Sequence, residues 1–217
     1  MGALDDPANR LKGTDLKPPH NNLKTRVFQS CVSISVMKVL PKSFFRRPVL
    51  KVAPELLGKY LVREMPTRLR QGYGGRRKIE RFLITEVEAY DGLLDLANHA
   101  SKGKTDRTKI MFESGGVWYV YLVYGMHEML NVVTGDADYP AAVLIRGVEN
   151  ISGPGRLTKK LQINRKLNGK PASKETGLWI EDNGEKISAS KIIRTPRIGV
   201  AYAKEWAQKP YRFVLKR

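Results

Sequence analysis

The fold is decided between Arg81 and Asn131, where the chain reads RFLITEVEAYDGLLDLANHASKGKTDRTKIMFESGGVWYVYLVYGMHEMLN. The stretch opens with alternating apolar and polar residues, a period of two that is typical of a β-strand. Alternation predicts one face made of Phe82, Ile84, Glu86, Glu88 and Tyr90 and another made of Leu83, Thr85, Val87 and Ala89. Two carboxylates and a tyrosine should therefore leave the strand on the same side, just before Asp91-Gly92 turns the chain.

A second strand is predicted after Gly115-Gly116, where residues 117–124 read VWYVYLVY. Aromatic and β-branched residues of this kind are enriched in strands. Two further strands are predicted at 129–134 and 141–146, with turn residues between them. Sequential strands joined by short turns favour an antiparallel meander.

Elements on either side of this centre predict the fold class. Leu57, Tyr60 and Leu61 share a helical stripe, which predicts a helix over 54–61 with Pro54 in its first turn. Further predicted elements are a basic amphipathic helix at 154–164, a hairpin at 178–187 around Asn183-Gly184, and strands at 192–200 and 212–215. We expect a mixed α/β fold of the α+β kind, a single domain built around an antiparallel sheet with flanking helices.

The chain is strongly basic. Its 217 residues contain 39 Lys and Arg against 21 Asp and Glu, a net charge of +18, where a small soluble domain usually carries about 2–8. Such a field favours polyanions, nucleic acid before an anionic membrane surface. No apolar run approaches the ~20 residues that span a bilayer. The single cysteine, Cys31, excludes an internal disulfide and a cysteine-based metal site, so a reducing compartment is expected.

Residues 1–41 predict a disordered tail, because they are rich in Pro and Asn and carry little periodic hydrophobicity. They hold six basic and three acidic residues, which leaves +15 of the +18 on the predicted domain at 42–217. The apolar piece at 27–36 lacks the pattern of a signal peptide. The basic character therefore belongs to the folded part.

The central stretch also predicts chemistry. A carboxylate on an apolar strand among aromatic side chains is partly desolvated, which raises its pKa and makes it a better proton acceptor. Tyr90, His99, Tyr119 and Tyr121 are flat groups that can hold a planar ligand. A nucleobase is planar, and it must leave the duplex before its sugar bond can be attacked. A carboxylate base, an aromatic pocket and a basic surface together suggest an enzyme that removes bases from DNA.

Six segments resemble the alkyladenine, or 3-methyladenine, DNA glycosylase family, in the order in which that family carries them. They are TEVEAY (85–90), Asn98-His99, YVYLVYGMHEMLN (119–131), VLIRGVE (143–149), GPGRLTKKLQIN (153–164) and RIGVAYAKEWAQKPYRF (197–213). Several motifs in family order are far more specific than any one of them. The resemblance covers the predicted domain and leaves residues 1–41 outside.

The resemblance implies a curved antiparallel sheet, no metal and no cofactor. It implies excision of alkylated purines such as 3-methyladenine and 7-methylguanine, and also of deaminated or etheno-bridged purines, from double-stranded DNA. Glu88 falls on the general base that activates a water, and Arg146 on a residue that helps to place this water. Three residues fall on groups that stack around the flipped base, namely Tyr90, His99 and Tyr121.

The same resemblance places a wedge at Tyr124, with Met126 beside it, which enters the minor groove and fills the vacated space. Asn131 falls on the residue that crowds the amino group of normal guanine. His127 stands where the family commonly has tyrosine, and Leu130 where it has methionine, so the detail of DNA insertion is left open.

Several residues keep a second interpretation. Glu86 is structural or supports the site indirectly, and Tyr119 is equally consistent with a phosphate contact and with packing. Lys159 and Lys160 either contact phosphate or form a solvated helix face. Arg146 and Asn131 need buried partners, because polar groups on apolar strands are costly unless they are bonded.

Two other function classes remain alternatives. A basic DNA-binding module without catalysis would share the sheet and the charge. A metal nuclease built on Glu86 and Glu88 would need further Asp or His ligands. We expect a monomer that binds damaged double-stranded DNA and no membrane, in the cytoplasm and nucleoid of a bacterium or the nucleus of a eukaryote.

Overall fold

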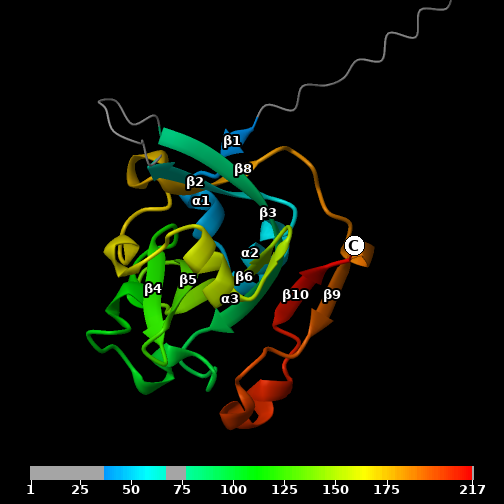
Figure 1. Cartoon of the computed structure of the whole chain (residues 1–217). Helices are drawn as coiled ribbons and strands as arrows, with labels where there is room; N and C mark the ends of the chain where they lie inside the picture. The colour runs from blue at the N-terminus through cyan, green and yellow to red at the C-terminus, as the bar shows by residue number, and fades with distance from the viewer. Residues whose placement is uncertain (1–36, 67–76, 217) are drawn as a thin grey trace, which may run out of the picture. The chain divides into compact units, whose positions relative to one another are not determined.

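The computed structural model describes residues 37–66 and 77–216 (Figure 1). Most of the predicted tail lies outside the described residues, so its disorder stays a prediction. Its last residues belong to the fold, because Lys38 and Val39 pair with a strand and Leu40 is buried in the core. The predicted domain boundary at 41/42 is therefore a few residues too late.

Within the described residues, ten strands form the sheet, and every pairing among them is antiparallel. Seven strands follow the order β1-β8-β2-β3-β6-β5-β4, while β10 pairs with β3 and β9, and β7 pairs with β6. Their bounds are β1 Lys38–Val39, β2 Tyr60–Pro66, β3 Arg77–Asp91, β4 Trp118–Val123, β5 His127–Val133, β6 Ala141–Val148, β7 Ile151–Ser152, β8 Leu178–Asp182, β9 Ile192–Thr195 and β10 Arg212–Leu215. The predicted meander is confirmed, since β4, β5 and β6 are consecutive neighbours.

Few helices accompany the sheet (Figure 1). The α-helices are α1 Lys42–Phe45, α2 Val49–Leu56 and α3 Pro154–Lys160. Short 3-10 helices are η1 His99–Lys102, η2 Lys109–Phe112, η3 Arg165–Leu167, η4 Lys174–Thr176, η5 Ala189–Lys191 and η6 Ala201–Gln208. The longest helices of the described residues have 8 residues, too few for a membrane span. This arrangement confirms the expected α+β class.

Strand β3 connects the two halves of the sheet. Its first half pairs with β2, and its second half lies between β6 and β10. The register against β6 shifts on both sides of Glu86, which marks a β-bulge. The predicted face is therefore wrong at Ile84, which is buried in the same core cluster as Val87 and Ala89. Beyond the bulge the predicted alternation holds, and Glu86, Glu88 and Tyr90 leave the opposite face.

Strand β4 contributes to two apolar clusters. Trp118 and Val120 lie in the main core with α2 and the central strands. Tyr119 and Tyr121 lie on the other face, in a smaller cluster with Met111. The strand therefore places Trp118 and Tyr119 on opposite faces. The tyrosine face is the one that borders the cavity described below.

Two local predictions are wrong. The helix predicted at 54–61 ends at Leu56, and Pro54 stands in its last turn, because the apolar positions of α2 begin earlier, at Val49 and Val52. Tyr60 and Leu61 already belong to β2. The hairpin predicted at Asn183-Gly184 does not form, since β8 pairs with β1 and β2 instead of with the residues that follow it. The helix at 154–164 is confirmed over its first seven residues.

Candidate active site

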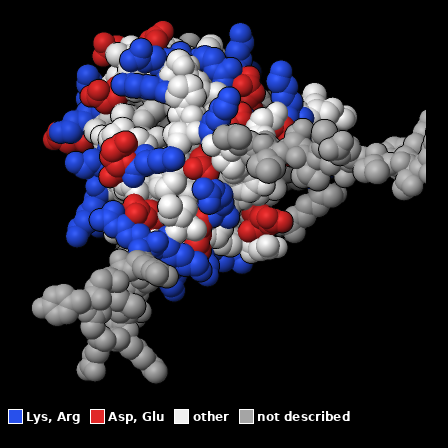
Figure 2. All heavy atoms as spheres, turned by 90° about the horizontal axis from the view of Figure 1, so that it is seen from above, with Lys and Arg blue, Asp and Glu red and all other residues white. Residues whose placement is uncertain are grey.

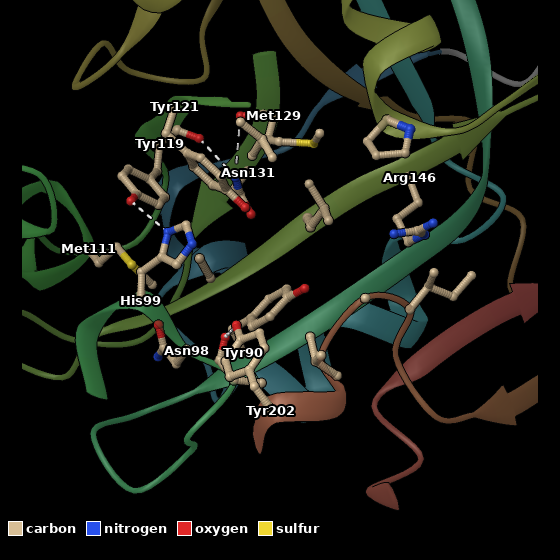
Figure 3. Close-up of a pocket in the computed structure, with 18 of the residues that line it drawn as sticks. Tyr90, Asn98, His99, Met111, Tyr119, Tyr121, Met129, Asn131, Arg146 and Tyr202 are labelled. Carbon is tan, nitrogen blue, oxygen red and sulfur yellow. Dashed lines mark hydrogen bonds between the residues drawn. The ribbon is translucent and has the colours of Figure 1, made fainter. Parts of the chain in front are cut away.

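A cavity of about 290 Å³ opens between strands β3 to β6, helix η1 and the chain around Ile198 (Figure 3). This lies at the lower end of the range of small-molecule pockets, about 300–1,000 Å³. Seven of the residues singled out from the sequence line it: Tyr90, His99, Tyr119, Tyr121, Tyr124, Asn131 and Arg146. The fold therefore brings together side chains that are far apart in the sequence, from Tyr90 to Arg146.

Aromatic rings form one wall of this cavity. The rings of His99 and Tyr121 lie 4.4 Å apart at an angle of 67°, and those of Tyr119 and Tyr121 lie 5.1 Å apart. The Nδ1 atom of His99 is 3.2 Å from the hydroxyl of Tyr119, which fixes the orientation of the imidazole (Figure 3). Three packed rings on neighbouring elements make a rigid surface for a flat ligand.

The imidazole of His99 is held neutral. Burial, with a smaller contribution from the nearby Arg107 guanidinium, lowers its pKa to about 4. At pH 7 the ring therefore carries no charge. A neutral ring can face a cationic ligand without repulsion.

Tyr90 lies across the cavity from these rings (Figure 3). Its hydroxyl donates to Oε2 of Glu88 at 2.9 Å. Burial raises the pKa of Tyr90 well above its usual value, and the Glu88 carboxylate adds to the shift, so the phenol stays protonated. The ring is fixed both by this hydrogen bond and by the strand that carries it.

Glu88 lies directly behind the cavity and is fully buried. Oε1 accepts the backbone N–H of Ile198 at 2.8 Å and faces Nη1 of Arg146 at 3.5 Å, and Oε2 accepts from Tyr90. All three partners line the cavity. We expected a partly desolvated carboxylate beside the ligand, whereas the structure covers it with the side chains and backbone that it binds.

Burial raises the pKa of Glu88, while Arg146 and the two hydrogen bonds act in the opposite direction. A raised pKa with a cationic partner is the combination expected of a carboxylate that takes up a proton.

Arg146 connects this carboxylate to a second one. Its Nε donates to Oε1 of Glu86 at 3.0 Å, and the same oxygen accepts from Nε of Arg212 at 2.6 Å. Glu86 therefore holds Arg146 in place, as its alternative interpretation predicted. The buried partners expected for Arg146 are present.

Asn131 is buried on β5, and its side chain is bonded. Its Nδ2 donates to the carbonyl oxygens of Tyr119 at 3.1 Å and Met129 at 3.4 Å. These bonds offset the cost of an amide on an apolar strand. They also hold the group at a fixed place in the lining of the cavity.

The turn between β4 and β5 projects two apolar side chains. Tyr124 is 89 % exposed and Met126 is 73 % exposed, beside a cavity that Tyr124 also lines. Tyr124 has a φ of 50°, in the left-handed region that disfavours side chains, and Gly125 follows at 69°. Large apolar groups held out into solvent at a strained turn indicate a contact surface.

Comparison with known proteins identifies the family. The family model described as methylpurine-DNA glycosylase matches residues 43–153 and 149–217. The chain belongs to this family. A DNA glycosylase of DNA repair is thus the general class of activity.

Curated relatives agree with this. The chain is 44 % identical over 197 residues to a protein of Methanocella arvoryzae, with 82 % of this chain and 92 % of the relative covered. It is 46 % identical over 187 residues to one of Legionella pneumophila strain Corby (83 % and 96 %) and 45 % over 185 residues to one of Myxococcus xanthus (81 % and 89 %). All three are named "Putative 3-methyladenine DNA glycosylase".

The remaining predicted residues of this methylpurine-DNA glycosylase homologue lie away from the cavity. Lys159 and Lys160 are exposed on α3, which leaves both of their interpretations open. Lys and Arg side chains cover much of the face shown in Figure 2, with acidic groups between them. Of the departures from the family pattern, His127 is exposed at the start of β5 and Leu130 is buried in the core. Leu130 therefore affects packing before it affects any ligand.

Some residues of the site carry no individual signal in the sequence. Tyr202 and Ile198 line the cavity, and Arg197 and Asp95 form a buried ion pair behind Tyr90. Three of these lie in the segment 197–213, which the family resemblance covers, but no periodicity marks them individually. Within the described residues, no group of three or more His, Cys, Asp or Glu side chains is placed to hold a metal ion.

The pKa of Glu88 predicts how base release depends on pH. Since the carboxylate must be ionised to accept a proton, the rate should fall as the pH drops through a pKa raised above 4.5. His99 titrates only at about 4, so His99→Gln should lower the rate but leave unchanged the pH at which the rate begins to fall. Single-turnover rates between pH 4 and 8 measure both. A shift of that pH in His99→Gln would contradict the assignment of the pH dependence to Glu88.

Proposed function

We propose that the protein is a monofunctional DNA glycosylase of base excision repair, which flips alkylated purines out of duplex DNA and hydrolyses their N-glycosidic bond. The substrates are 3-methyladenine and 7-methylguanine, and also deaminated and etheno-bridged purines. The single observation that carries the proposal is a buried carboxylate, Glu88, bonded to the groups that line an aromatic cavity next to an exposed apolar turn.

The aromatic wall supports a flat ligand. His99 and Tyr121 on one side and Tyr90 on the other are positioned to stack on a purine that enters the cavity (Figure 3). Stacking on aromatic side chains contributes about 1–3 kcal/mol per base. Tyr124, at the adjacent turn, would fill the space that the base leaves, with Met126 beside it.

In the proposed reaction a water molecule attacks the sugar carbon C1′. Its oxygen forms the new bond to C1′, Glu88 accepts a proton, and the electron pair of the C1′–N bond leaves with the purine. An alkylated purine is cationic, so it leaves as a neutral base, whereas a neutral lesion needs protonation first. The partners of Glu88 cover its carboxylate, so the attacking water has to enter between the carboxylate and one of them. The longest of these contacts is the 3.5 Å ion pair between Glu88 and Arg146. Water between Glu88 and Arg146 fits the role proposed for Arg146.

Selectivity against normal guanine is assigned to Asn131. Its amide is held by two backbone carbonyls and cannot easily move away from the exocyclic amino group of guanine. Rejection then results from crowding and from an unpaired polar group. The partner is damaged double-stranded DNA. The protein binds it as a monomer, in the nucleoid of a bacterium or in the nucleus of a eukaryote. Lys159 and Lys160, exposed on α3, are weaker candidates for backbone contacts, whereas Tyr119 is buried, which favours its packing interpretation over a phosphate contact.

The decisive assay is release of free bases from a panel of duplexes, each with one lesion. The wild-type protein should release 7-methylguanine and 3-methyladenine, and EDTA should not change the rate, since no step of the reaction uses a metal. Liquid chromatography of the free bases measures both. DNA binding without release would support the non-catalytic module, and loss of activity in EDTA would support the metal nuclease.

A further inference from the structure

An ion pair is buried behind the candidate base pocket. Nη1 and Nη2 of Arg197 bond to Oδ2 and Oδ1 of Asp95 at 2.5 and 2.8 Å, and neither side chain is exposed at all. The two residues are 102 positions apart in the chain. The remaining hydrogen bonds of the guanidinium go to the carbonyls of Ala89 at 2.8 Å and Trp206 at 3.1 Å. Arg197 is therefore fixed from three directions.

This fixed cation faces a ring of the pocket. The guanidinium carbon of Arg197 lies over the ring of Tyr90, 4.9 Å from its centroid. Tyr90 lines the cavity, whereas Arg197 is not among the lining residues. A base that stacks on the open side of Tyr90 would therefore be separated from the buried charge of Arg197 by the Tyr90 ring alone.

The charges buried behind the pocket balance, and the Arg107 guanidinium near the ring of Tyr121 is exposed to solvent, where its field is screened. Arg197 is paired with Asp95, while Arg146 and Arg212 share the carboxylates of Glu86 and Glu88. His99 adds no charge at neutral pH, because its pKa is lowered to about 4. Without Asp95, one positive charge behind Tyr90 would be uncompensated in a medium where screening is weak.

We propose that Asp95 and Arg197 determine specificity by charge: the carboxylate cancels the field of Arg197 behind Tyr90, so that the pocket accepts cationic as well as neutral purines. The inference rests on the proposed function, because it requires the base to stack on Tyr90. Removal of the Asp95 charge, which lies about 8–12 Å from the base, would change the affinity for a cation by roughly 5- to 30-fold at an effective dielectric constant of about 20–30. A neutral base would be much less affected.

Asp95 also has a structural task, which the test must separate from its charge. Its carboxylate accepts the backbone N–H groups of Asp91 and Ala97, both at 3.1 Å. Loss of these bonds could disturb the loop and lower the affinity for every lesion. A shift in the ratio between cationic and neutral lesions cannot arise in this way.

The experiment measures dissociation constants of two duplexes, each relative to the undamaged duplex. One carries cationic 7-methylguanine and the other neutral ethenoadenine, both on 2′-fluorinated sugars that slow cleavage. Three variants are compared with the wild type: Asp95→Asn, Arg197→Gln and the double variant, which removes both charges. Thermal unfolding of each variant verifies that it is folded at the assay temperature.

Asp95→Asn should weaken binding of 7-methylguanine relative to ethenoadenine by about 5- to 30-fold. Arg197→Gln should shift the ratio in the opposite direction, and the double variant should return it to within about threefold of the wild-type value. If Asp95→Asn does not fold, the fall in the ratio from Arg197→Gln to the double variant tests the same charge.

Equal effects on both lesions, or a double variant that does not recover the ratio, would overturn the inference and leave the glycosylase proposal intact. A wild-type protein that binds neither lesion duplex more tightly than undamaged DNA would overturn both.

Discussion

Glu88→Gln should bind lesion-containing duplex DNA but release almost no base. The amide keeps the shape of the carboxylate, so it can still accept a hydrogen bond from Tyr90 or Ile198, but it cannot accept a proton from water. Proton transfer by a positioned side chain contributes typically 10²–10⁴-fold to a rate. We expect the single-turnover rate of 7-methylguanine release to fall by about 10²–10⁴-fold.

Glu181→Gln is the matched control for this variant. Glu181 is also a buried glutamate on a strand, here β8. It accepts hydrogen bonds from Trp179 and Arg81 and does not line the cavity. The rate should stay within about threefold of wild type for this variant, because no reacting group is touched. If Glu88→Gln retained most of the wild-type rate, Glu88 would not be the base.

Tyr124→Gly should reduce base release strongly without destabilising the protein. The exposed ring is lost, and with it a stacking contribution of about 1–3 kcal/mol, equivalent to roughly 5- to 150-fold in kcat/KM. Because residue 124 has a φ of 50°, glycine fits the backbone without the strain that tyrosine bears. Thermal unfolding should therefore show an unchanged or higher midpoint.

A second apolar truncation tests whether the effect belongs to this turn. Ile193 is 41 % exposed on β9 and lies outside the cavity lining. Ile193→Ala should leave kcat/KM close to the wild-type value. Equal losses for Ile193→Ala and Tyr124→Gly would mean that the turn has no special role in DNA contact.

The strands were predictable from the sequence because their patterns are local. Alternation in 81–91 and aromatic composition in 117–124 identified β3 and β4. The error at Ile84 has a local cause, since the bulge at Glu86 shifts the register by one position, and a one-residue shift moves a side chain to the other face. Periodicity alone does not show a bulge.

The other two errors arise from tertiary context. An Asn-Gly pair favours a tight hairpin, but β8 is placed between β1 and β2, so its edges are already paired. The helix around Pro54 was misplaced because Leu57 and Tyr60 continue a helical spacing by chance. Their backbone is already turning into β2, after Gly58 at a φ of 80°.

Some residues of the site were likewise predictable from local sequence, and others depend on the folded chain. Residues clustered on two strands, such as Glu88, Tyr90 and Tyr121, could be proposed from the sequence together with the family resemblance. The ion pair of Arg197 with Asp95 could not, because only the folded chain brings together positions so far apart. The complete burial of Glu88 was also not foreseen, since it depends on Ile198 and Arg146, which reach it from other elements.

The location of the damaged base tests the central claim most directly. A crystal structure of Glu88→Gln bound to a duplex with one 7-methylguanine measures it without any assumption about rates. We predict that the purine lies in the cavity between Tyr90 and the rings of His99 and Tyr121, with C1′ beside Gln at position 88 and Tyr124 inserted in the helix. A purine still stacked in the duplex, with the cavity empty, would contradict the account.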